Sequence, residues 1–213
     1  MGAGFASVAV GGPWKDKPTL FEFYLLPEHH ARAFGLFETL LASTNARFFE
    51  AQTNDSLFTG MVLTYGRDVV SEKIVFRDGF TTHLVVNDSS LLAVTSKEEI
   101  RLCIEQRQGG GEWVLEIAGT AAAKGGILFH YNRPYGDIYM EVNEEFRRRG
   151  LGSYLVQELK RECYKLGAIP CARCSPSNVA SRRTLQRAGF VPVAHILNGS
   201  ISLDGQRPST LGN

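Results

Sequence analysis

The feature that most constrains this chain is residues 142–153, with the sequence VNEEFRRRGLGS. A strand-like run precedes this segment, and apolar residues at helical spacing follow it. Free N–H groups at a helix start attract anions together with the helix dipole, and glycines let the backbone approach phosphate oxygens closely. Arg147, Arg148 and Arg149 would add charge-assisted contacts. The segment therefore predicts a phosphate-binding turn before a helix that begins at Leu151.

Other nucleotide-binding motifs fit this turn poorly. Leu155 stands where a dinucleotide-binding fingerprint has its third glycine, and the turn lacks the Gly-Lys-Ser/Thr ending of a P-loop. A solvated basic turn, in which the glycines only shape the backbone, is the alternative for the segment taken alone.

A second motif follows downstream. Residues 178–190 read N-x-x-S-x-x-x-L-x-R-x-G-F, with the Gly-Phe pair eleven residues after Asn178. Taken in order, the two segments resemble motifs A and B of the GNAT acetyltransferases. Arg147, Gly150 and Gly152 match the Arg/Gln-x-x-Gly-x-Gly/Ala pattern of motif A residue for residue.

This resemblance extends over about residues 84–197 and is sharpest over 137–190. It implies an α/β fold with a mixed, mostly antiparallel central sheet, flanked by helices and splayed at the strand that ends at Val142, with an extra N-terminal α/β segment. It also implies an N-acetyltransferase that uses acetyl-CoA as acetyl-donor cosubstrate. A primary amine would attack the thioester directly in a ternary complex, without a covalent enzyme intermediate.

The family pattern also assigns coenzyme-binding residues. The backbone of Met140 and Val142 would pair with the pantetheine arm, while Asn178 and Ser181 would flank the far end of that arm or the acetyl group. The turn and the helix start would hold the pyrophosphate through Arg147, Arg148, Arg149, Gly150, Leu151, Gly152 and Ser153.

Two carboxylates are candidates for the catalytic base. An amine with a pKa of about 10 is mostly protonated at neutral pH, so a base or a water chain must accept its proton. Asp137 and Glu141 share one face of the strand with Tyr139. We expect Glu141 to be the base because it adjoins the splay, with Asp137 as the second candidate. A solvated face, or pairing with the arginines, is the alternative for both.

Two positions depart from the family pattern. Leu185 stands seven residues after Asn178, where many members have a Tyr that protonates the departing thiolate, so Ser181, Tyr154 or water would take that role. Arg173 stands where some protein-acetylating relatives have a Glu. We therefore expect a small-molecule amine as the acceptor, and Arg173 either meets a carboxylate of that substrate or stays exposed.

Hydrophobic periodicity predicts the other elements. Strands are expected at 19–26, 47–52, 72–76, 82–86, 113–117, 126–131, 137–142, 170–174 and 190–197, and helices at 29–43, 57–65, 96–106, 151–166 and from Asn178. The strands between 113 and 142 suggest an antiparallel meander, with a turn at 121–125.

A boundary near Gly79 would divide the chain into residues 1–80 and an acetyltransferase domain, 81–213. The first part has the order strand, Asn-preceded helix and Gly66, which resembles the order strand, Asn-capped helix and Gly189 of the second. It has no Arg-x-x-Gly-x-Gly turn, so we expect a degenerate half-repeat without a phosphate site. Chance similarity is the alternative.

Composition argues against several classes of function. A net charge of +1 offers no long-range attraction to nucleic acid or to an anionic membrane, and no apolar run suits a membrane span or a secretory signal. Four unevenly spaced cysteines indicate reduced thiols and a cytoplasmic protein. The lone Cys171-x-x-Cys174 pair lacks the partners of a zinc site, so no metal is expected. The sequence leaves a homodimer open.

Two rival functions stay open at this point. An acyl-CoA-binding or sensing module without catalysis would tolerate the missing Tyr, and it would bind coenzyme without releasing thiol on any amine. A nucleic-acid-binding protein would use the arginines at 147–149, but no aromatic interleaving or basic net charge accompanies them.

Overall fold

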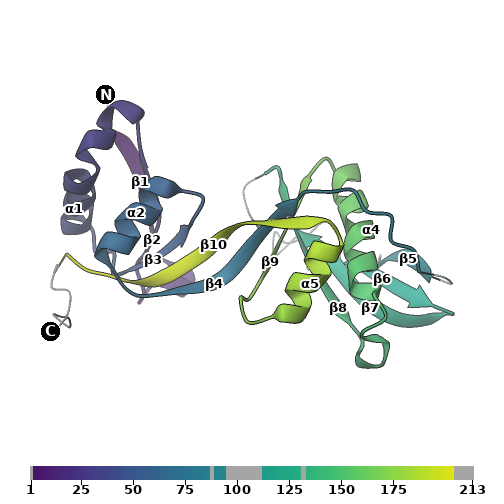
Figure 1. The fold of residues 1–213 in the computed structure, drawn as a ribbon. Coiled ribbons are helices and arrows are strands. Elements are labelled where there is room, and N and C mark those ends of the chain that lie inside the picture. Colours follow the sequence, from purple (N-terminus) through teal and green to yellow (C-terminus); the bar gives the residue numbers. More distant parts are fainter. Residues whose placement is uncertain (1, 87–88, 95–111, 131–132, 204–213) are drawn as a thin grey trace, which may run out of the picture. The chain divides into compact units, whose positions relative to one another are not determined.

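The computed structural model describes residues 2–86, 89–94, 112–130 and 133–203. The chain forms two compact units, one from residues up to 73 together with those from 194 onward, the other from residues 74–193. It enters the second unit within strand β4 (Gly66–Asp78) and leaves it within strand β10 (Phe190–Ile201) (Figure 1). The helix predicted at 96–106 lies outside the described residues.

The first unit is a small α/β layer. Its other elements are β1 (Gly4–Ala9), η1 (Gly12–Trp14), β2 (Thr19–Leu25), η2 (Pro27–Arg32), α1 (Ala33–Ser43), β3 (Phe48–Gln52) and α2 (Ser56–Tyr65). β1 and β2 are antiparallel, β2 and β3 are parallel, and β3 pairs antiparallel with the end of β10. The core of this unit is rich in phenylalanine, with Phe37, Phe49 and Phe58 fully buried.

The second unit contains a larger sheet. Its other elements are β5 (Ser89–Val94), β6 (Glu112–Ile117), β7 (Thr120–Leu128), β8 (Tyr135–Val142), η3 (Glu144–Phe146), α4 (Leu151–Lys165), β9 (Ile169–Cys174) and α5 (Val179–Arg187). The strand order is β4-β9-β8-β7-β6-β5, and every neighbouring pair is antiparallel except β8 and β9. The expected mixed, mostly antiparallel sheet is therefore confirmed.

Helix α4 packs its apolar face on β7 and β8. Leu155, Leu159 and Cys163 are completely buried, as the helical spacing predicts. Gly167, with a φ of 71°, ends the helix in the left-handed conformation that favours glycine. The same helical spacing would place Leu166 on this buried face, but Leu166 is 49% exposed, because the helix ends one residue before it.

Residues 82–86 were predicted to form a strand, and this was wrong. The side chain of Gln157 on α4 bonds to the backbone groups that a neighbouring strand would take. Its Oε1 accepts from Leu84 N at 2.7 Å, and its Nε2 donates to Leu84 O at 3.0 Å. The Thr82 hydroxyl also donates to Gln157 Oε1 at 2.8 Å. The edge strand of this sheet is β5, which was not predicted.

The turn predicted at 121–125 was also wrong, because these residues lie inside β7. A Cβ added to Gly125 would lie 2.9 Å from Leu159 Cδ1 and 2.5 Å from Tyr139 O, so small residues are needed beneath α4. The chain reverses instead at Ala118 and Gly119, with φ values of 48° and 76°. The meander of β6, β7 and β8 was predicted correctly.

In the first unit, the helix predicted at 29–43 begins as the 3₁₀ segment η2 and becomes α-helical at Ala33. The helical spacing of Phe34, Phe37 and Leu41 within 29–43 predicts one buried face, and Phe37 and Leu41 are buried, but Phe34 is 55% exposed. Phe34 lies in the first turn of α1, and periodicity gives the face of a helix but not how far along the helix the core extends. Strand β1 was not predicted.

Candidate functional site

The loop between β8 and α4 leaves the first backbone N–H groups of α4 uncapped, so that they can donate hydrogen bonds to a ligand. Gly150 precedes the helix with a φ of 83° and has no side chain to cap the first amides. Arg148 also adopts a positive φ, 62°. Uncapped amides and the helix dipole favour an anion at this point, as the sequence predicts.

Strand β8 separates from β9 part-way along its length. The two strands pair in parallel from Tyr135 with Ile169 to Asp137 with Cys171. Beyond Asp137, no residue of β8 pairs with β9 in the described part of the chain, although β8 continues to Val142. An open strand edge therefore leads toward the start of α4.

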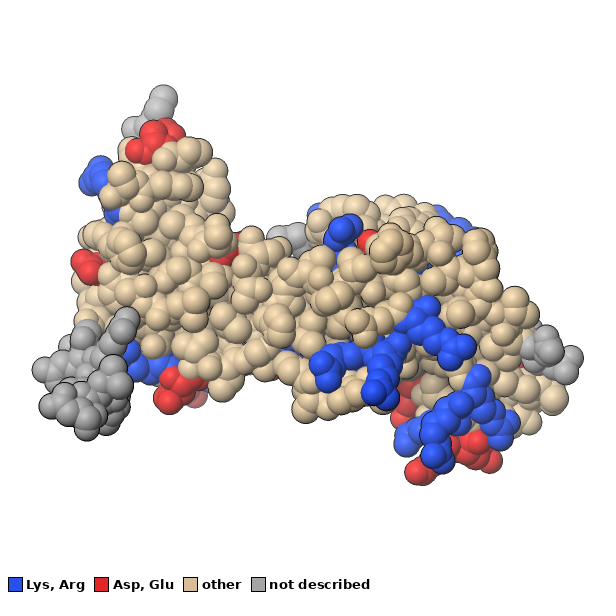
Figure 2. Space-filling model, viewed as in Figure 1, with Lys and Arg blue, Asp and Glu red and all other residues tan. Residues whose placement is uncertain are grey.

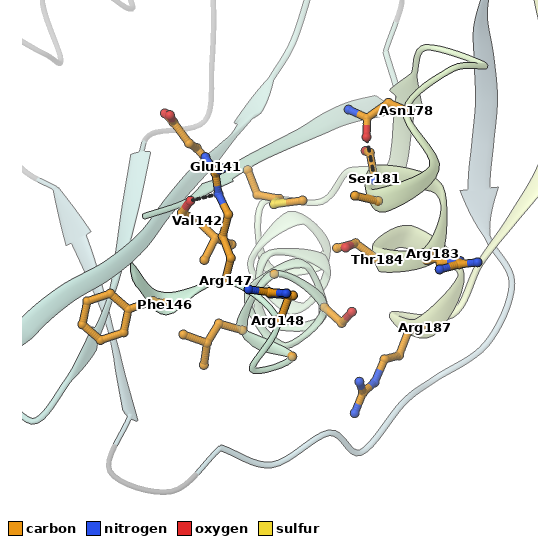
Figure 3. A pocket seen from close by; sticks show the side chains of 16 residues that line it. Glu141, Val142, Phe146, Arg147, Arg148, Asn178, Ser181, Arg183, Thr184 and Arg187 are labelled. Carbon is orange, nitrogen blue, oxygen red and sulfur yellow. Dashed lines mark hydrogen bonds between the residues drawn. The ribbon is translucent and has the colours of Figure 1, made fainter. Parts of the chain in front are cut away.

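A pocket of about 600 Å³ is lined by the end of β8, the start of α4 and α5 (Figure 3). Most of the predicted coenzyme-binding residues line it: Met140, Val142, Arg147, Arg148, Gly150, Leu151, Gly152, Ser153, Asn178 and Ser181. Arg149 does not line it. Its Nη2 donates to Glu145 O at 3.2 Å, and its guanidinium lies 5.2 Å from the centre of the Phe146 ring.

Ser181 is the one residue of α5 that was predicted to line this pocket, and four others were not predicted. Arg183, Thr184 and Arg187 line it together with Ala180. These positions recur at helical spacing after Asn178, so a helical projection from the predicted cap would have found them. Figure 2 shows Lys and Arg side chains gathered over α5 and over the loop before α4.

Gly152 keeps the pocket open. A Cβ at this position would lie 3.2 Å from Thr184 Cγ2 and 3.4 Å from both Met140 Sδ and Val142 Cγ2. These neighbours come from α5 and β8, so a larger side chain would project between the elements that line the pocket. The glycine is needed here for space, since the residue lies within the regular helix α4.

Asp137 lies in a cluster of ionisable groups where β8 and β9 part. Its Oδ2 accepts hydrogen bonds from Arg173 Nε at 3.1 Å and Nη2 at 2.9 Å, and it lies 3.1 Å from His130 Nε2. Burial raises the pKa of Asp137 to about 7, because desolvation outweighs the attraction of the arginine. Burial, and then the charge of Arg173, lower the pKa of His130. Asp137 does not line the pocket, but a pKa of about 7 suits a general base that works at neutral pH.

Glu141 has a different environment from Asp137. Its side chain is 66% exposed and lies 3.7 Å from Lys124 Nζ on β7. Glu141 lines the pocket, but its side chain points away from Asn178 and Ser181 (Figure 3). Of the two candidate bases, Glu141 is solvated and Asp137 is buried.

Helix α5 begins as predicted, with Asn178 Oδ1 accepting from Ser181 N at 2.9 Å. Leu185, at the position of the family's Tyr, is buried in the core of the second unit. Tyr154 packs against the same core and lines a separate pocket with His83 and Glu158. Of the two side chains expected to replace that Tyr, Ser181 is the one that lines the candidate pocket.

The profile of the acetyltransferase (GNAT) family matches residues 78–190, slightly more than half of the chain. The chain belongs to the GNAT acetyltransferase family. It is therefore an acetyltransferase, and the matched range contains the open helix start, the splayed strand and α5. No curated protein sequence matches the chain.

Solved structures of GNAT proteins share this fold. An acetyltransferase from Colwellia psychrerythraea is 15% identical with a TM-score of 0.66, over 86% of this chain and 78% of that one. A GCN5-related N-acetyltransferase from Sphaerobacter thermophilus is 12% identical with a TM-score of 0.58, over 93% and 76%. A tandem GNAT protein from the clavulanic acid biosynthesis pathway is 14% identical with a TM-score of 0.50, over 86% and 75%.

Within the described ranges, none of the helices combines the length and the apolar character that crossing a bilayer requires.

Proposed function

We propose that this GNAT protein transfers the acetyl group of acetyl-CoA to the primary amine of a small molecule, by direct attack in a ternary complex. The observation that carries the proposal is the pocket at the start of α4. There an uncapped helix start, two glycines and several arginines meet the open edge of β8. An anion-binding end next to free strand backbone fits a ligand that has a pyrophosphate and an amide-containing arm.

The residues of the pocket fit the coenzyme. The amides from Arg148 to Ser153 would hold the pyrophosphate, since Gly150 leaves them uncapped. The backbone of Met140 and Val142 would pair with the pantetheine arm along the open edge of β8. Asn178 and Ser181 would lie beside the far end of that arm. When bound, acetyl-CoA supplies a thioester whose carbonyl carbon a neutral amine attacks.

We assign proton uptake to Asp137 rather than to Glu141. A carboxyl group with a pKa of about 7 is substantially ionised at neutral pH and still basic enough to accept a proton from an amine. His130 contacts this carboxyl group, is less buried, and has a lowered pKa, so it is suited to pass the proton on to solvent. Arg173 holds the carboxylate in place through two hydrogen bonds.

The proposed acceptor is small. The Asp137 side chain is only 8% exposed, so an amine that reaches it must be slender. Arg173 occupies the position where some protein-acetylating relatives have a Glu, and it donates hydrogen bonds to Asp137. The departing thiol resembles a free cysteine with a pKa of about 8.5, so it can leave as a thiolate, with Ser181 or water as a proton donor.

A thiol-release assay tests this function. The purified full-length protein is incubated with acetyl-CoA and with polyamines, amino acids, aminoglycosides or peptide amino termini, and the products are identified by mass spectrometry. We expect amine-dependent thiol release with one class of small amines and an acetylated product. Coenzyme binding without thiol release on any amine would instead favour a sensing module. A protein that binds no coenzyme would refute the proposal.

We also propose that residues 1–80 are a degenerate half-repeat of the same fold. In support, β2 and β3 pair in parallel through their first residues, Thr19 with Phe48, and α1 connects them; β8, α4 and β9 have the same arrangement. A side-chain cap begins α2, as one begins α5. The 3₁₀ segment η2 precedes α1 in place of a glycine turn, so this half has lost the phosphate site.

We place the protein in the cytoplasm. Cys163, Cys171 and Cys174 are free thiols, the form that a reducing compartment maintains. Cell fractionation followed by immunoblotting of the tagged protein would check this location.

A further inference from the structure

The pocket at the start of α4 carries more positive charge than a pyrophosphate needs. Four arginines line it, Arg147, Arg148, Arg183 and Arg187. Arg147 is engaged within its own loop: its Nε donates to Val142 O at 3.2 Å, and its Nη1 lies 3.9 Å from Glu144 Oε1. In the described ranges, none of the other three forms an ion pair with a carboxylate.

Helix α5 carries much of this positive charge, and the stability of the helix does not require all of it. Its sequence, VASRRTLQR, holds three arginines and no acidic residue. Arg183 and Arg187 are four residues apart on one helix face, a spacing at which like charges repel and destabilise the helix. Both are exposed. Arg187 gains from the helix dipole in the last turn, but the stability of α5 does not account for Arg183.

The arginines form two groups around the start of α4. Arg147 and Arg148 come from the loop, whereas Arg183 and Arg187 project from α5 (Figure 3). The guanidinium atoms of Arg187 lie 3.6–3.8 Å from the position that a Cβ on Gly150 would occupy. The α5 group therefore lies within reach of a second anionic group on any ligand held at the amides of α4.

We propose that Arg183 and Arg187 form a subsite for a phosphate monoester, the 3′-phosphate on the ribose of coenzyme A; the inference rests on the function proposed above. Each phosphate of the pyrophosphate diester carries one charge, which the α4 amides and Arg148 can offset. A phosphate monoester carries close to two charges at pH 7 and presents three acceptor oxygens, which suits two guanidinium groups.

This subsite determines which donor the enzyme accepts. The phosphopantetheine arm of an acyl carrier protein has a thioester and a pantetheine, but it has no ribose phosphate. The α5 arginines therefore favour free coenzyme A thioesters over carrier-bound ones. Dephospho-coenzyme A, which lacks only the 3′-phosphate, isolates this contribution.

Titration calorimetry of the full-length protein tests the subsite. Wild-type protein should bind acetyl-CoA about 100-fold more tightly than acetyl-dephospho-CoA, since two arginines contact the 3′-phosphate and a hydrogen bond to a charged group contributes about tenfold. The double variant Arg183→Gln/Arg187→Gln should bind acetyl-CoA about 100-fold more weakly than wild type, at about tenfold per arginine, and should bind acetyl-dephospho-CoA unchanged. Adenosine 3′,5′-bisphosphate against ADP should show the same preference.

Lys165→Gln is the matched control, because it removes one positive charge from the exposed end of α4, where Lys165 pairs with Glu162. Its affinity for both coenzymes should equal that of wild type. Without ligand, the double variant should melt close to wild type, since the loss of a repulsive pair offsets the loss of the favourable dipole interaction of Arg187. Equal wild-type affinity for the two coenzymes, or an equal loss for both in the double variant, would overturn the subsite. A wild-type protein that binds neither coenzyme would refute the proposed function itself.

Discussion

Arg173 donates two hydrogen bonds to a single carboxylate oxygen of Asp137, from Nε at 3.1 Å and from Nη2 at 2.9 Å. The same Nη2 lies 2.9 Å from His130 Nε2. An arginine alone would lower the pKa of a carboxyl group, but burial raises that of Asp137 to about 7. Because Asp137 is also the last β8 residue that pairs with β9, the cluster lies where the sheet opens.

Asp137→Asn should lower kcat at pH 7 by about 10²–10⁴-fold, because an amide cannot accept the proton of the amine. The affinity for acetyl-CoA should not change, since Asp137 does not line the coenzyme pocket. Thiol release measures the first quantity and calorimetry the second.

The control for this prediction is Glu141→Gln, which removes a solvated carboxylate from the same strand face. Its rate should stay within about threefold of wild type, well below the effect expected for a catalytic base. The wild-type kcat should also rise with pH through about 7, and this rise should vanish in Asp137→Asn. A larger loss in Glu141→Gln than in Asp137→Asn would make Glu141 the base.

Asp137 should also make stability depend on pH. Its pKa is about 7 in the folded state and about 4 in an unfolded chain, so the folded state binds more protons between these values. Its contribution to the free energy of unfolding is therefore present below about pH 4 and is lost as the pH rises through 7. When the pH rises from 5 to 7, the free energy of unfolding measured in urea should fall by about 2 kcal/mol more in wild type than in Asp137→Asn. Parallel behaviour of the two proteins would contradict the raised pKa.

Gly152→Val should weaken acetyl-CoA binding about tenfold or more, because the side chain would fill the space between Thr184, Met140 and Val142. Gly60→Val is the matched control. Gly60 also lies inside a helix, α2, but a Cβ there would meet nothing within 4 Å. Both variants carry the same helix-propensity penalty, so calorimetry on the two folded proteins isolates the steric effect. Unchanged affinity in Gly152→Val would show that the coenzyme binds elsewhere.

The parts of the site that were predictable from sequence depend on local backbone chemistry. Gly150 marks a left-handed position before a helix, and Asn178 caps the next helix through a hydrogen bond three residues ahead. Such features depend only on residues that are close together in the sequence, so they can be recognised without knowing the fold. The ten predicted residues that line the pocket lie within two short segments for that reason.

The parts that were missed depend on contacts between distant residues. The side chain of Gln157 forms hydrogen bonds with the backbone N–H and C=O of Leu84, 73 residues away. Residues 82–86 therefore show the sequence pattern of a strand but do not pair as one. The choice between Asp137 and Glu141 depends on burial, which two acidic residues on one strand face do not reveal. Arg187 was read as part of a family motif, and its place beside Gly150 shows that it lines the pocket at the start of α4.

Asp78→Asn should lower the free energy of unfolding by about 3–5 kcal/mol, because it leaves a buried ammonium without its counter-charge. Lys160 is 5% exposed; its Nζ pairs with Asp78 and donates to Phe80 O at 2.8 Å and to Ala188 O at 2.9 Å. Glu162→Gln, which breaks the exposed pair with Lys165 on the same helix, should change stability by less than about 1 kcal/mol. Equal effects in urea unfolding would mean that Lys160 does not depend on Asp78.

The same contacts predict the behaviour of a truncated protein that contains only residues 81–213. It would lack Asp78 and Phe80, which hold the buried Lys160, and the whole of β4, which pairs with β9 at residues 74–77. The uncovered edge of β9 and an unpaired buried lysine are both destabilising, so we expect this protein not to fold, as judged by circular dichroism and by the absence of a cooperative urea transition. A protein that begins at residue 66 keeps all of β4 and should retain more native structure. If the 81–213 protein folds and binds acetyl-CoA, β4 is dispensable, and the boundary predicted near Gly79 is a true folding boundary.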